Sequence, residues 1–321
     1  MATNRPAGTV RLLLVAVLSV CSASAFADLA PQEWLNRMGM AVKTTNYEGT
    51  VILIQDGSAE ALRVVHTVKD GVVHEKVVAQ EGNGLEIIRK GNEVHCILPD
   101  RQHVLVEEWD NQSTLFSTLP SSDVQFGSEY DVSIVRKERV AGREAMLLAI
   151  RPHDEYRYGH KIWLDYETGF PLQTQLISAG NAIEQVKFAE ITLNEEIAAS
   201  SLMPSMNTEN FTWLEQPSSH KGSSVETTWQ SDALPAGFRA VSTHEEAMND
   251  GGEMVTHIMF SDGLANVSVF IAANSGKLES GPARVGGSNS YSITQGDYEI
   301  TGIGEVPAVT VEQIVTTMRQ P

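Results

Sequence analysis

The side chains best suited to chemistry are concentrated in one short stretch of the chain. Residues 153–160 read His-Asp-Glu-Tyr-Arg-Tyr-Gly-His, the densest group of ionisable and aromatic side chains in the sequence. Histidines and carboxylates can exchange protons with a substrate when they converge on it. Two interpretations are open. In the first, the stretch is a functional site, either a docking loop or an active site that lacks a recognisable nucleophile. In the second, it is a strand connection whose arginine pairs with neighbouring carboxylates. The second interpretation is favoured for any single residue within it.

A second group of residues could hold a metal ion. His95, Cys96 and His103 fall in one predicted hairpin, and Cys together with His can bind zinc. Successive residues of a strand point to opposite faces, so His95 and Cys96 cannot both join His103 in one site. The sequence has no His-Glu-x-x-His or Cys-x-x-Cys spacing. We therefore expect no metal site, and a buried, inert Cys96.

Other catalytic signatures are missing from the sequence. It contains no Gly-x-Ser-x-Gly elbow, no Gly-x-x-x-x-Gly-Lys loop, and no Gly-x-Gly-x-x-Gly after a strand. Paired carboxylates occur, for example at Glu107-Glu108, but adjacent residues on a strand face apart. We therefore expect a binding protein with no catalytic residues and no cofactor.

The first 27 residues have the pattern of an export signal. Arg5 and Arg11 give a positive start, an apolar run follows at residues 12–20, and Ala25-Phe26-Ala27 fits a small-x-small cleavage site. The apolar run is much shorter than the ~20 residues of a membrane-spanning helix. We predict cleavage after Ala27. Lipidation at Cys21 is the less favoured alternative, because a bulky valine precedes that cysteine.

Cysteine content and charge restrict the function further. Removal of the signal leaves Cys96 alone, so the mature chain cannot form an internal disulfide. The full chain has 41 acidic and 23 basic residues, a formal net charge of −18. Such a surface repels nucleic acid and anionic membranes. It would suit a basic partner, although solubility alone is the simpler explanation.

The residue pattern predicts an α+β protein that is mainly β. A helix is expected to begin at Pro31, with Trp34, Leu35 and Met38 on one face. Roughly eleven short segments rich in Val and Ile follow between residues 47 and 193, separated by turn sequences such as Asp56-Gly57. Connections this short allow antiparallel pairing and leave no room for parallel crossovers. We predict a large curved antiparallel meander.

Both faces of this predicted sheet are apolar in places. A sheet wetted on one side should alternate cleanly, yet residues 146–148 read Met-Leu-Leu. Residues 108–127 are too long for a hairpin loop and too apolar for a linker, which predicts a lid. A lidded apolar sheet could hold an acyl chain, and a filled core beneath a long loop explains the pattern equally well. The predicted cavity residues are Val51, Leu53, Leu62, Val64, Ile97, Met146, Leu148, Ile162 and Leu164, and the predicted lid residues are Leu115, Phe116 and Leu119.

The chain is expected to divide where its periodicity is lost. Residues 28–200 form the predicted N-terminal domain, residues 201–231 a linker, and residues 232–321 a smaller α+β domain. The second domain is expected to contain a hairpin with its turn at Ser261-Asp262-Gly263. It closes with a helix for which Thr310 and Gln313 are predicted to form a capping box.

Several segments, taken in order, resemble one family, the sigma-E factor regulatory proteins RseB and MucB. The resembling segments are Asn46-Tyr47-Glu48-Gly49, Glu86-Ile87-Ile88-Arg89, Val94-His95-Cys96, Val140-Ala141-Gly142-Arg143-Glu144, Tyr156-Arg157-Tyr158-Gly159-His160, Trp163-Leu164-Asp165, Thr168-Gly169-Phe170-Pro171-Leu172, Leu234-Pro235-Ala236-Gly237-Phe238, Phe260-Ser261-Asp262-Gly263-Leu264-Ala265 and Gly304-Glu305-Val306-Pro307. No single segment is diagnostic, but the ordered set covers both predicted domains.

The resemblance implies a periplasmic protein whose N-terminal domain is similar to lipoprotein carriers, an unclosed β half-barrel packed with helices. It also implies binding to the periplasmic part of a membrane-spanning anti-sigma factor (RseA- or MucA-like), which is thereby shielded from proteolysis. Lipopolysaccharide or mislocalised lipoprotein would release this shield. The acidic chain suggests that acyl chains, not phosphates, provide most of the affinity for such a lipid.

Partner docking is expected at five residues of the two domains. These are Arg157, Tyr158, His160, Phe238 and Phe270. A periplasmic lipid or lipoprotein carrier is the alternative function, although a simple carrier has no evident use for the second domain. The sequence is also compatible with a homo-oligomer.

Overall fold

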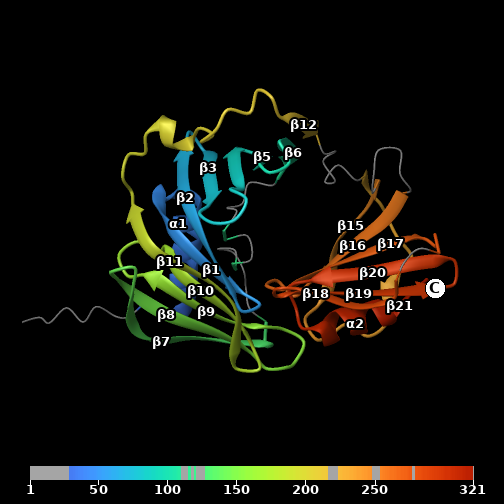
Figure 1. Cartoon of the computed structure of the whole chain (residues 1–321). Helices are drawn as coiled ribbons and strands as arrows, with labels where there is room; N and C mark the ends of the chain where they lie inside the picture. The colour runs from blue at the N-terminus through green and yellow to red at the C-terminus, as the bar shows by residue number, and fades with distance from the viewer. Residues whose placement is uncertain are drawn as a thin grey trace, which may run out of the picture.

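The computed structural model of the chain describes residues 29–109, 115–116, 119–120, 127–215, 223–247, 254–276 and 279–320. The predicted export signal and its cleavage site after Ala27 lie outside these ranges. The described residues form two β-rich bodies that lie side by side (Figure 1). Neither helix within these ranges has the length and apolar character needed to cross a membrane.

The N-terminal body is built on one sheet of 12 strands, in the order β12-β6-β5-β4-β3-β2-β1-β11-β10-β9-β8-β7. The strands are β1 (Tyr47–Gln55), β2 (Ser58–Lys69), β3 (Val72–Ala79), β4 (Glu86–Lys90), β5 (Glu93–Leu98), β6 (His103–Glu108), β7 (Tyr130–Val140), β8 (Arg143–Pro152), β9 (Gly159–Asp165), β10 (Pro171–Ser178), β11 (Asn181–Leu193) and β12 (Thr212–Glu215). All neighbours are antiparallel except β12 and β6. Because β12 and β7 form the two edges and do not pair with each other, the sheet is unclosed, as predicted.

The strand order departs from a simple meander at two places, between β6 and β7 and between β11 and β12. β6 and β7 follow each other in the chain but lie at opposite ends of the sheet. The two halves of the sheet are instead joined in its middle, where β1 pairs with β11 along its whole length. The chain therefore joins β6 to β7 across opposite sides of the sheet. Topology thus accounts for the long connection that the sequence analysis interpreted as a lid.

Helix α1 (Pro31–Thr44) covers one face of this sheet, which we call the inner face. Proline suits the first turn because its missing N–H needs no partner there, and the Glu33 carboxylate accepts a hydrogen bond of 2.8 Å from the Ala30 N–H. The apolar side of the helix shares a hydrophobic cluster with the sheet. This cluster includes Trp34, Leu35, Met38, Met146, Leu148, Ile162 and Leu164. The helix therefore begins at the predicted residue and buries the predicted face.

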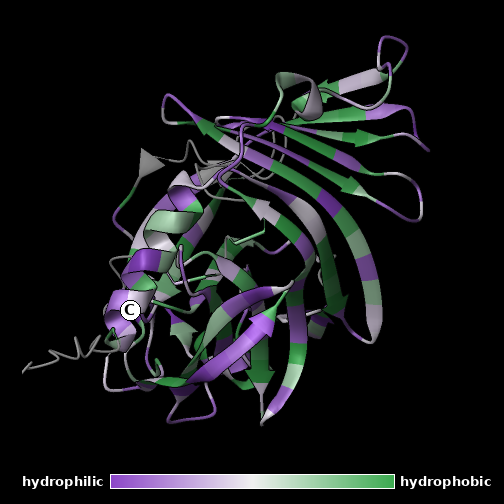
Figure 2. Ribbon diagram, turned by 90° about the vertical axis from the view of Figure 1, so that its left-hand side faces the viewer, coloured by the Kyte–Doolittle hydropathy of each residue, from purple (hydrophilic) through white to green (hydrophobic). Residues whose placement is uncertain are grey.

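The opposite, outer face is also apolar at β8, as the sequence suggested. Leu147 lies across from Trp163 in β9, and both side chains are buried. The Trp163 Nε1–H donates a hydrogen bond of 2.6 Å to the Glu138 carboxylate, so the indole is both covered and satisfied. Figure 2 shows bands of hydrophobic and hydrophilic residues alternating along many of the strands. β8 is the exception because both of its faces are covered.

The C-terminal body has a 7-stranded sheet in the order β13-β15-β16-β17-β20-β19-β18. Its strands are β13 (Ser223–Ser224), β15 (Arg239–Ala247), β16 (Met254–Ser261), β17 (Asn266–Ala273), β18 (Gly281–Val285), β19 (Ser288–Gln295) and β20 (Tyr298–Gly304), with a small ladder of β14 (Gln230–Ser231) and β21 (Met318–Arg319) beside it. Helix α2 (Ala308–Thr316) packs on one face of this sheet through Val311, Ile314 and Val315. A smaller α+β domain is therefore present, as predicted, and the predicted hairpin forms between β16 and β17.

Helix α2 begins earlier than the predicted capping box places it. The N-cap residue is Pro307, so Thr310 lies inside the first turn, where it is buried. Its hydroxyl donates to the Tyr156 carbonyl of the other domain (2.6 Å), and Gln313 Nε2 donates to the Ala233 carbonyl (2.8 Å). The capping-box prediction is wrong because both side chains bind partners that lie far away in the sequence.

Part of the segment expected to be a linker packs on the N-terminal sheet. The short 3-10 helix η1 (Ala199–Leu202) is followed by Ser205, whose backbone N–H donates to the Glu86 carboxylate (2.9 Å). Strand β12 then joins the edge of the sheet beside β6, and His95 makes an edge contact with Trp213 at 5.2 Å. Figure 1 shows this segment running over the top of the N-terminal body toward the second domain.

The close approach of β1 and β11 gives a first prediction. A Cβ atom added at Gly49 would lie 2.4 Å from the Glu190 carbonyl oxygen, which belongs to the backbone of the paired strand. The variant Gly49→Ala must therefore push the two halves of the sheet apart, and we expect a loss of about 1–3 kcal/mol of unfolding free energy. Urea denaturation followed by circular dichroism measures it. The neighbouring variant Thr50→Ala should change stability by less than ~0.5 kcal/mol, and equal losses in the two variants would contradict the assignment.

Candidate functional site at the domain junction

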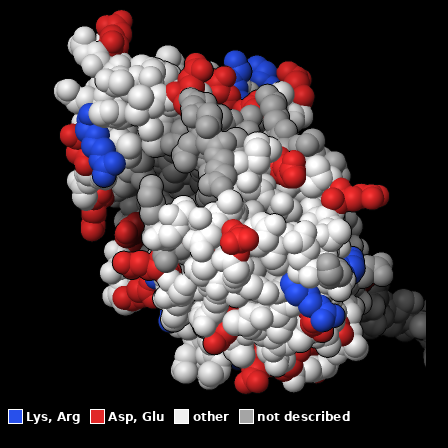
Figure 3. Space-filling model, turned by 90° about the vertical axis from the view of Figure 1, so that its right-hand side faces the viewer, with Lys and Arg blue, Asp and Glu red and all other residues white. Residues whose placement is uncertain are grey.

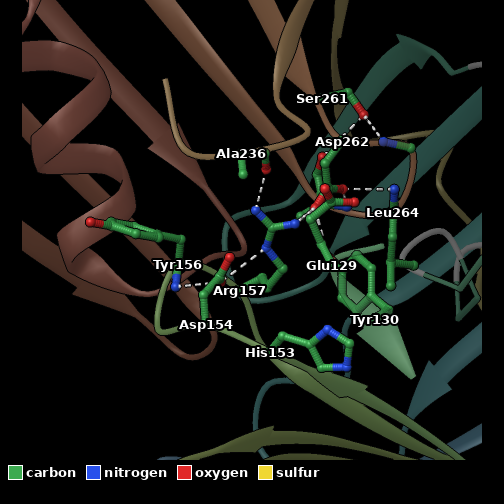
Figure 4. Close-up of polar contacts among 12 residues, drawn as sticks. Glu129, Tyr130, His153, Asp154, Tyr156, Arg157, Ala236, Ser261, Asp262 and Leu264 are labelled. Atoms are coloured by element: carbon green, nitrogen blue, oxygen red, sulfur yellow. Dashed lines mark hydrogen bonds and ion pairs between the residues drawn. The ribbon is translucent and has the colours of Figure 1, made fainter. Parts of the chain in front are cut away.

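The junction between the two bodies is organised around one buried arginine. Arg157 lies in the loop between β8 and β9, and its side chain has no exposed surface. Its Nη2 donates a hydrogen bond of 2.5 Å to the Ala236 carbonyl. Its Nη1 and Nε lie 3.1 Å and 3.2 Å from carboxylate oxygens of Asp262 and Asp154. Figure 4 shows the guanidinium between these groups, two of which belong to the C-terminal body.

Asp262 receives hydrogen bonds or ion pairs on both carboxylate oxygens. One oxygen accepts the backbone N–H groups of Leu264 and Ala265 at 2.9 Å and 2.7 Å, which forms the turn between β16 and β17. The other accepts the Tyr130 hydroxyl at 2.8 Å and pairs with Arg157. The Asp262 carboxylate is therefore fully engaged by donors from both domains. The predicted hairpin turn between β16 and β17 therefore also supplies the contribution of the C-terminal body to the junction.

Aromatic rings enclose the arginine. The guanidinium carbon lies 5.4 Å from the Tyr130 ring centroid and 5.3 Å from that of Phe238, within the range of cation–π attraction. Burial, followed by the nearby Asp262 carboxylate, raises the pKa of Tyr130, so its hydroxyl stays protonated and donates. The rings and the ion pair together exclude water from the contact.

Two further hydrogen bonds extend this junction along the same loop. The Asn289 side-chain amide donates to the Tyr158 hydroxyl (2.9 Å) and to the Val306 carbonyl (2.8 Å). The Thr310 hydroxyl of α2 donates to the Tyr156 carbonyl. All three residues of the sequence Tyr156-Arg157-Tyr158 thus bind the other domain, Tyr156 through its backbone and the other two through their side chains. The polar stretch singled out in the sequence is the domain contact.

A second contact between the domains lies at the turn that joins β18 and β19. The Asp56 carboxylate accepts the Gly286 N–H at 3.0 Å and lies 3.4 Å from Arg284. The Glu184 carboxylate of β11 accepts the Gly287 N–H and the Gln55 side-chain amide. Glycine is required at this turn because a Cβ atom at 286 or 287 would collide with the N-terminal body.

A cavity of about 200 Å³ lies between this contact and the inner face of the large sheet. It is lined by Leu53, Leu115, Leu119, His160, Thr174, Gln175, Leu176, Glu184, Val186 and Glu305. The lining combines aliphatic side chains with two carboxylates, Glu184 and Glu305. Burial lowers the pKa of His160 to about 4, so its imidazole is neutral at physiological pH. The cavity is bounded by both domains because Glu305 comes from the C-terminal body.

The structure brings most of the predicted cavity residues to one face of the sheet. Residues directly opposite on antiparallel strands share a face, and Val51 lies across from Leu62, as Leu148 lies across from Ile162. Only Leu53 among them lines the open cavity. The rest of this inner-face set packs in the two N-terminal hydrophobic clusters, largely against α1 and residues 115–119; it comprises Val51, Leu62, Val64, Met146, Leu148, Ile162 and Leu164.

Ile97 does not belong with this set. Ile97 lies across from Glu86 and Val104 on the neighbouring strands. Its neighbour Cys96 pairs with Ile87, and the strand pairing continues from Ile87 to Val64, so Cys96 is the residue on the inner face. Ile97 is therefore buried on the outer face, beneath the segment after β11 that binds Glu86. The prediction that Ile97 lines the cavity is therefore wrong by one residue of strand register. Cys96 and Ile97 are both apolar, so the sequence could not show which of the two faces inward.

The three predicted lid residues take two different positions. Leu115 and Leu119 line the cavity. Phe116 is buried, with its ring 5.5 Å from Phe170 and 6.4 Å from Phe188, so it is part of the core. The remainder of the predicted lid segment is partly outside the described residues.

The residues expected to dock a partner are also placed differently. Arg157, Tyr158 and Phe238 are buried in the contact between the domains and offer no surface to another molecule in this arrangement. His160 faces the cavity. Phe270 lies on the C-terminal sheet, stacked on His257 at 4.3 Å, away from the other four. The expected docking group is therefore corrected: the sequence pattern marked residues that bind across domains, which sequence alone cannot distinguish from binding between chains.

Sequence reasoning missed the C-terminal half of the junction. Asp262, Asn289, Thr310 and Glu305 are each unremarkable in the sequence, and nothing in their spacing relates them to residues 156–160. Only the family-like segments that contain Asp262 and Glu305 gave a signal, and it did not assign these residues a role. Within the described parts of the chain, no three His, Cys, Asp or Glu side chains cluster as metal ligands. Cys96 is partly buried, and burial followed by Glu107 raises its pKa to about 11.

Comparison with protein families matches both bodies. Residues 30–206 match the MucB/RseB N-terminal domain and residues 223–319 the MucB/RseB C-terminal domain. The chain is similar to the sigma factor AlgU regulatory protein MucB of Pseudomonas aeruginosa, with 29% identity over 316 residues and 96% of each chain covered. It is 26% identical to the sigma-E factor regulatory protein RseB of Haemophilus influenzae over 304 residues, covering 94% of this chain and 95% of that protein.

Solved structures of MucB share the arrangement of both domains. The MucB chain of a Pseudomonas aeruginosa MucA/MucB complex has a TM-score of 0.68 at 25% identity and covers 90% of this chain and 98% of that one. A crystal structure of MucB has a TM-score of 0.60 at 26% identity, covering 91% of this chain and 98% of that one. The TM-score is thus higher for the MucB chain of the complex.

The buried arginine gives a second prediction. In the variant Arg157→Met, the Asp262 carboxylate would remain buried without its cation, and we expect the junction to lose about 3–5 kcal/mol. Thermal unfolding should change from one transition to two, and small-angle X-ray scattering should show a larger radius of gyration. The matched control is Arg151→Met, since Arg151 is exposed and donates to Ser133 on its own domain.

The double variant Arg157→Met/Asp262→Asn tests the cause of this loss. Removing both charges should recover part of the coupling, because no uncompensated carboxylate is then buried. Indistinguishable scattering from Arg157→Met and Arg151→Met would mean that the ion pair does not hold the domains together.

Proposed function

Because the chain belongs to the MucB/RseB family, we propose that it is a periplasmic regulator that binds the periplasmic region of an inner-membrane anti-sigma factor. By this binding it would repress an extracytoplasmic stress sigma factor. The observation that carries the proposal is the match, across both domains, to MucB held in a complex with MucA. The names of the relatives, regulators of AlgU and of sigma-E, supply the class of sigma factor.

Repression is proposed to be steric. The bound chain covers the anti-sigma peptide and keeps it from the protease that starts its degradation. A clamp of this kind needs two bodies in a fixed relation, which the buried Arg157 and Asp262 provide. The greater similarity to MucB in the complex, with TM-scores of 0.67 and 0.68 against 0.60, supports the idea that this relation is the binding arrangement.

The charge of the chain supports a basic partner surface. The full chain has a formal net charge of −18. Figure 3 shows more acidic than basic side chains over the face of the C-terminal body turned to the viewer. Complementary charge increases the rate at which a basic peptide meets such a surface.

The release signal is proposed to be an acyl chain, from lipopolysaccharide or from a mislocalised lipoprotein. The supporting observation is the cavity lined by Leu53, Leu115, Leu119 and Val186. Its volume of about 200 Å³ is below the ~300 Å³ at which ligand pockets usually begin. A lipid must therefore displace part of the lining, and the lining includes residues of both domains. Entry of a chain would then alter the junction, which couples lipid binding to partner release.

A periplasmic lipid or lipoprotein carrier remains the second candidate function. The apolar wall of the cavity and the unclosed sheet favour it. A carrier does not, however, need a C-terminal domain fixed through a buried ion pair. The two candidates differ in a simple respect: a regulator forms a stable complex with the anti-sigma factor, and a carrier holds lipid without one.

The proposed function is tested by gel filtration of the mature chain with the periplasmic domain of its cognate anti-sigma factor. We expect co-elution as one complex, and dissociation when lipopolysaccharide is added. A lipoprotein in detergent, compared with detergent alone, serves as the second signal. Separate elution of the two proteins, with lipid co-purifying, would favour the carrier.

Filling the cavity tests the signal separately from the partner. Val186 lines the cavity on β11, and Val186→Phe should occupy the space while leaving the junction unchanged. We expect the complex to form normally and the lipid concentration needed for its release to rise by on the order of tenfold. The control is Val285→Phe, at a position that is 77% exposed. Release at the same lipid concentration in both variants would place the lipid elsewhere.

A further inference from the structure

Two carboxylates from different domains meet at the wall of the cavity. Glu184 lies at the start of β11, and Glu305 follows β20 in the turn that leads to α2. Both line the cavity, and both are partly buried. Glu184 accepts the Gly287 N–H, but no hydrogen bond or ion pair of the described residues neutralises Glu305. Docking of the domains therefore brings two like charges together in a poorly hydrated place.

The surrounding charged groups do not compensate for this repulsion. Asp56 adds a third carboxylate, and the nearby cation Arg284 is paired with it at 3.4 Å. His160 faces the cavity from β9 but is neutral, as described above. Burial raises the pKa of Tyr158, so this residue also carries no charge. The contact thus gathers three carboxylates and one guanidinium.

The position of Glu305 makes it sensitive to protons in the physiological range. Burial first, and then repulsion by Glu184, raise its pKa to about 7. Burial also raises the pKa of Glu184, against the two hydrogen bonds that this carboxylate accepts. A glutamate in water has a pKa of ~4.3. The pKa of Glu305 approaches this value when the domains separate at this contact.

We propose that the contact of Glu305 with Glu184 is a proton-operated latch between the two domains. When Glu305 is protonated, the turn between β18 and β19 stays docked on the N-terminal sheet through Gly286 and Gly287. When Glu305 is ionised, like-charge repulsion loosens this contact and opens the cavity wall that the C-terminal domain provides. The latch does not depend on which partner the protein binds.

The sign of the effect follows from proton linkage. The docked state binds the proton more tightly than the open state, so a fall in pH favours docking. The stabilisation is complete below ~4.3, the pKa of the open state, and is lost as the pH rises through the docked pKa of about 7. Between pH 6 and pH 8 the docking constant should fall by on the order of tenfold. The contact around Arg157 does not involve Glu305 or Glu184, so it serves as a hinge.

Electron spin resonance distances across the contact test this latch on the full mature chain. Spin labels at Ala59→Cys and Val285→Cys, in a Cys96→Ser background, report the separation of the two turns; all three positions carry uncharged side chains. We expect one short distance at pH 6 and a growing population of longer distances at pH 8. In Glu305→Gln, the short distance should persist at both pH values because the titrating charge is gone.

Two variants complete the test. Glu184→Gln removes the repulsion from the other side and should weaken the pH response. Glu312→Gln makes the same change of charge at an exposed position of α2 and should respond to pH like the parent chain. Identical distances at pH 6 and pH 8 in the parent chain, or an undiminished pH response in folded Glu305→Gln, would overturn the proposal. Neither result bears on whether the anti-sigma factor binds.

Discussion

A guanidinium that is removed from water must be surrounded by acceptors, and Arg157 finds them on both domains. The carbonyl of Ala236 and the carboxylate of Asp262 come from the C-terminal body, while Asp154 comes from the loop that carries the arginine. Neither domain alone could bury this charge without a large desolvation cost. The relation of the two bodies is therefore fixed by a polar requirement. Hydrophobic packing, by contrast, holds each body together separately.

The open sheet places the cavity at this junction. A sheet whose edge strands do not meet leaves part of its inner face without a partner strand or helix. Helix α1 fills one part, Phe116 fills another, and the remaining space lies beside β11, where the C-terminal body approaches. The last wall of the cavity is Glu305, a residue of the second domain. Any movement of the C-terminal body at this contact consequently changes the shape of the cavity as well.

The two interdomain contacts differ in their chemistry. At one, an arginine is paired with carboxylates and enclosed by Tyr130 and Phe238. At the other, carboxylates outnumber the cation, and burial brings the pKa of Glu305 to about 7. A fixed contact beside an adjustable one is the arrangement that a hinge requires. The glycines at 286 and 287 allow the adjustable contact to close, since no side chain fits there.

The sequence by itself determined the local elements. The start of α1 at Pro31, the antiparallel strands with their Gly-containing turns, and the apolar character of both faces of β8 followed from spacing and turn chemistry. These features depend on neighbouring residues, whose relation the sequence contains. The presence of a smaller second domain could be predicted for the same reason. The unusual length of the connection after β6 was also visible in the sequence, but it was interpreted as a lid, and its topological cause was not.

Only the tertiary structure decided which side chains meet. The register of Ile97 depended on a choice between two apolar neighbours, and the role of Thr310 depended on a carbonyl 154 residues away. The dense polar stretch at residues 153–160 was recognised as important, but its partner Asp262 was hidden in an ordinary hairpin turn. A buried ion pair between domains produces no residue pattern around either partner, because each charged residue is matched by a residue far away in the sequence. Long-range pairing of charges is thus the information that a single sequence does not display.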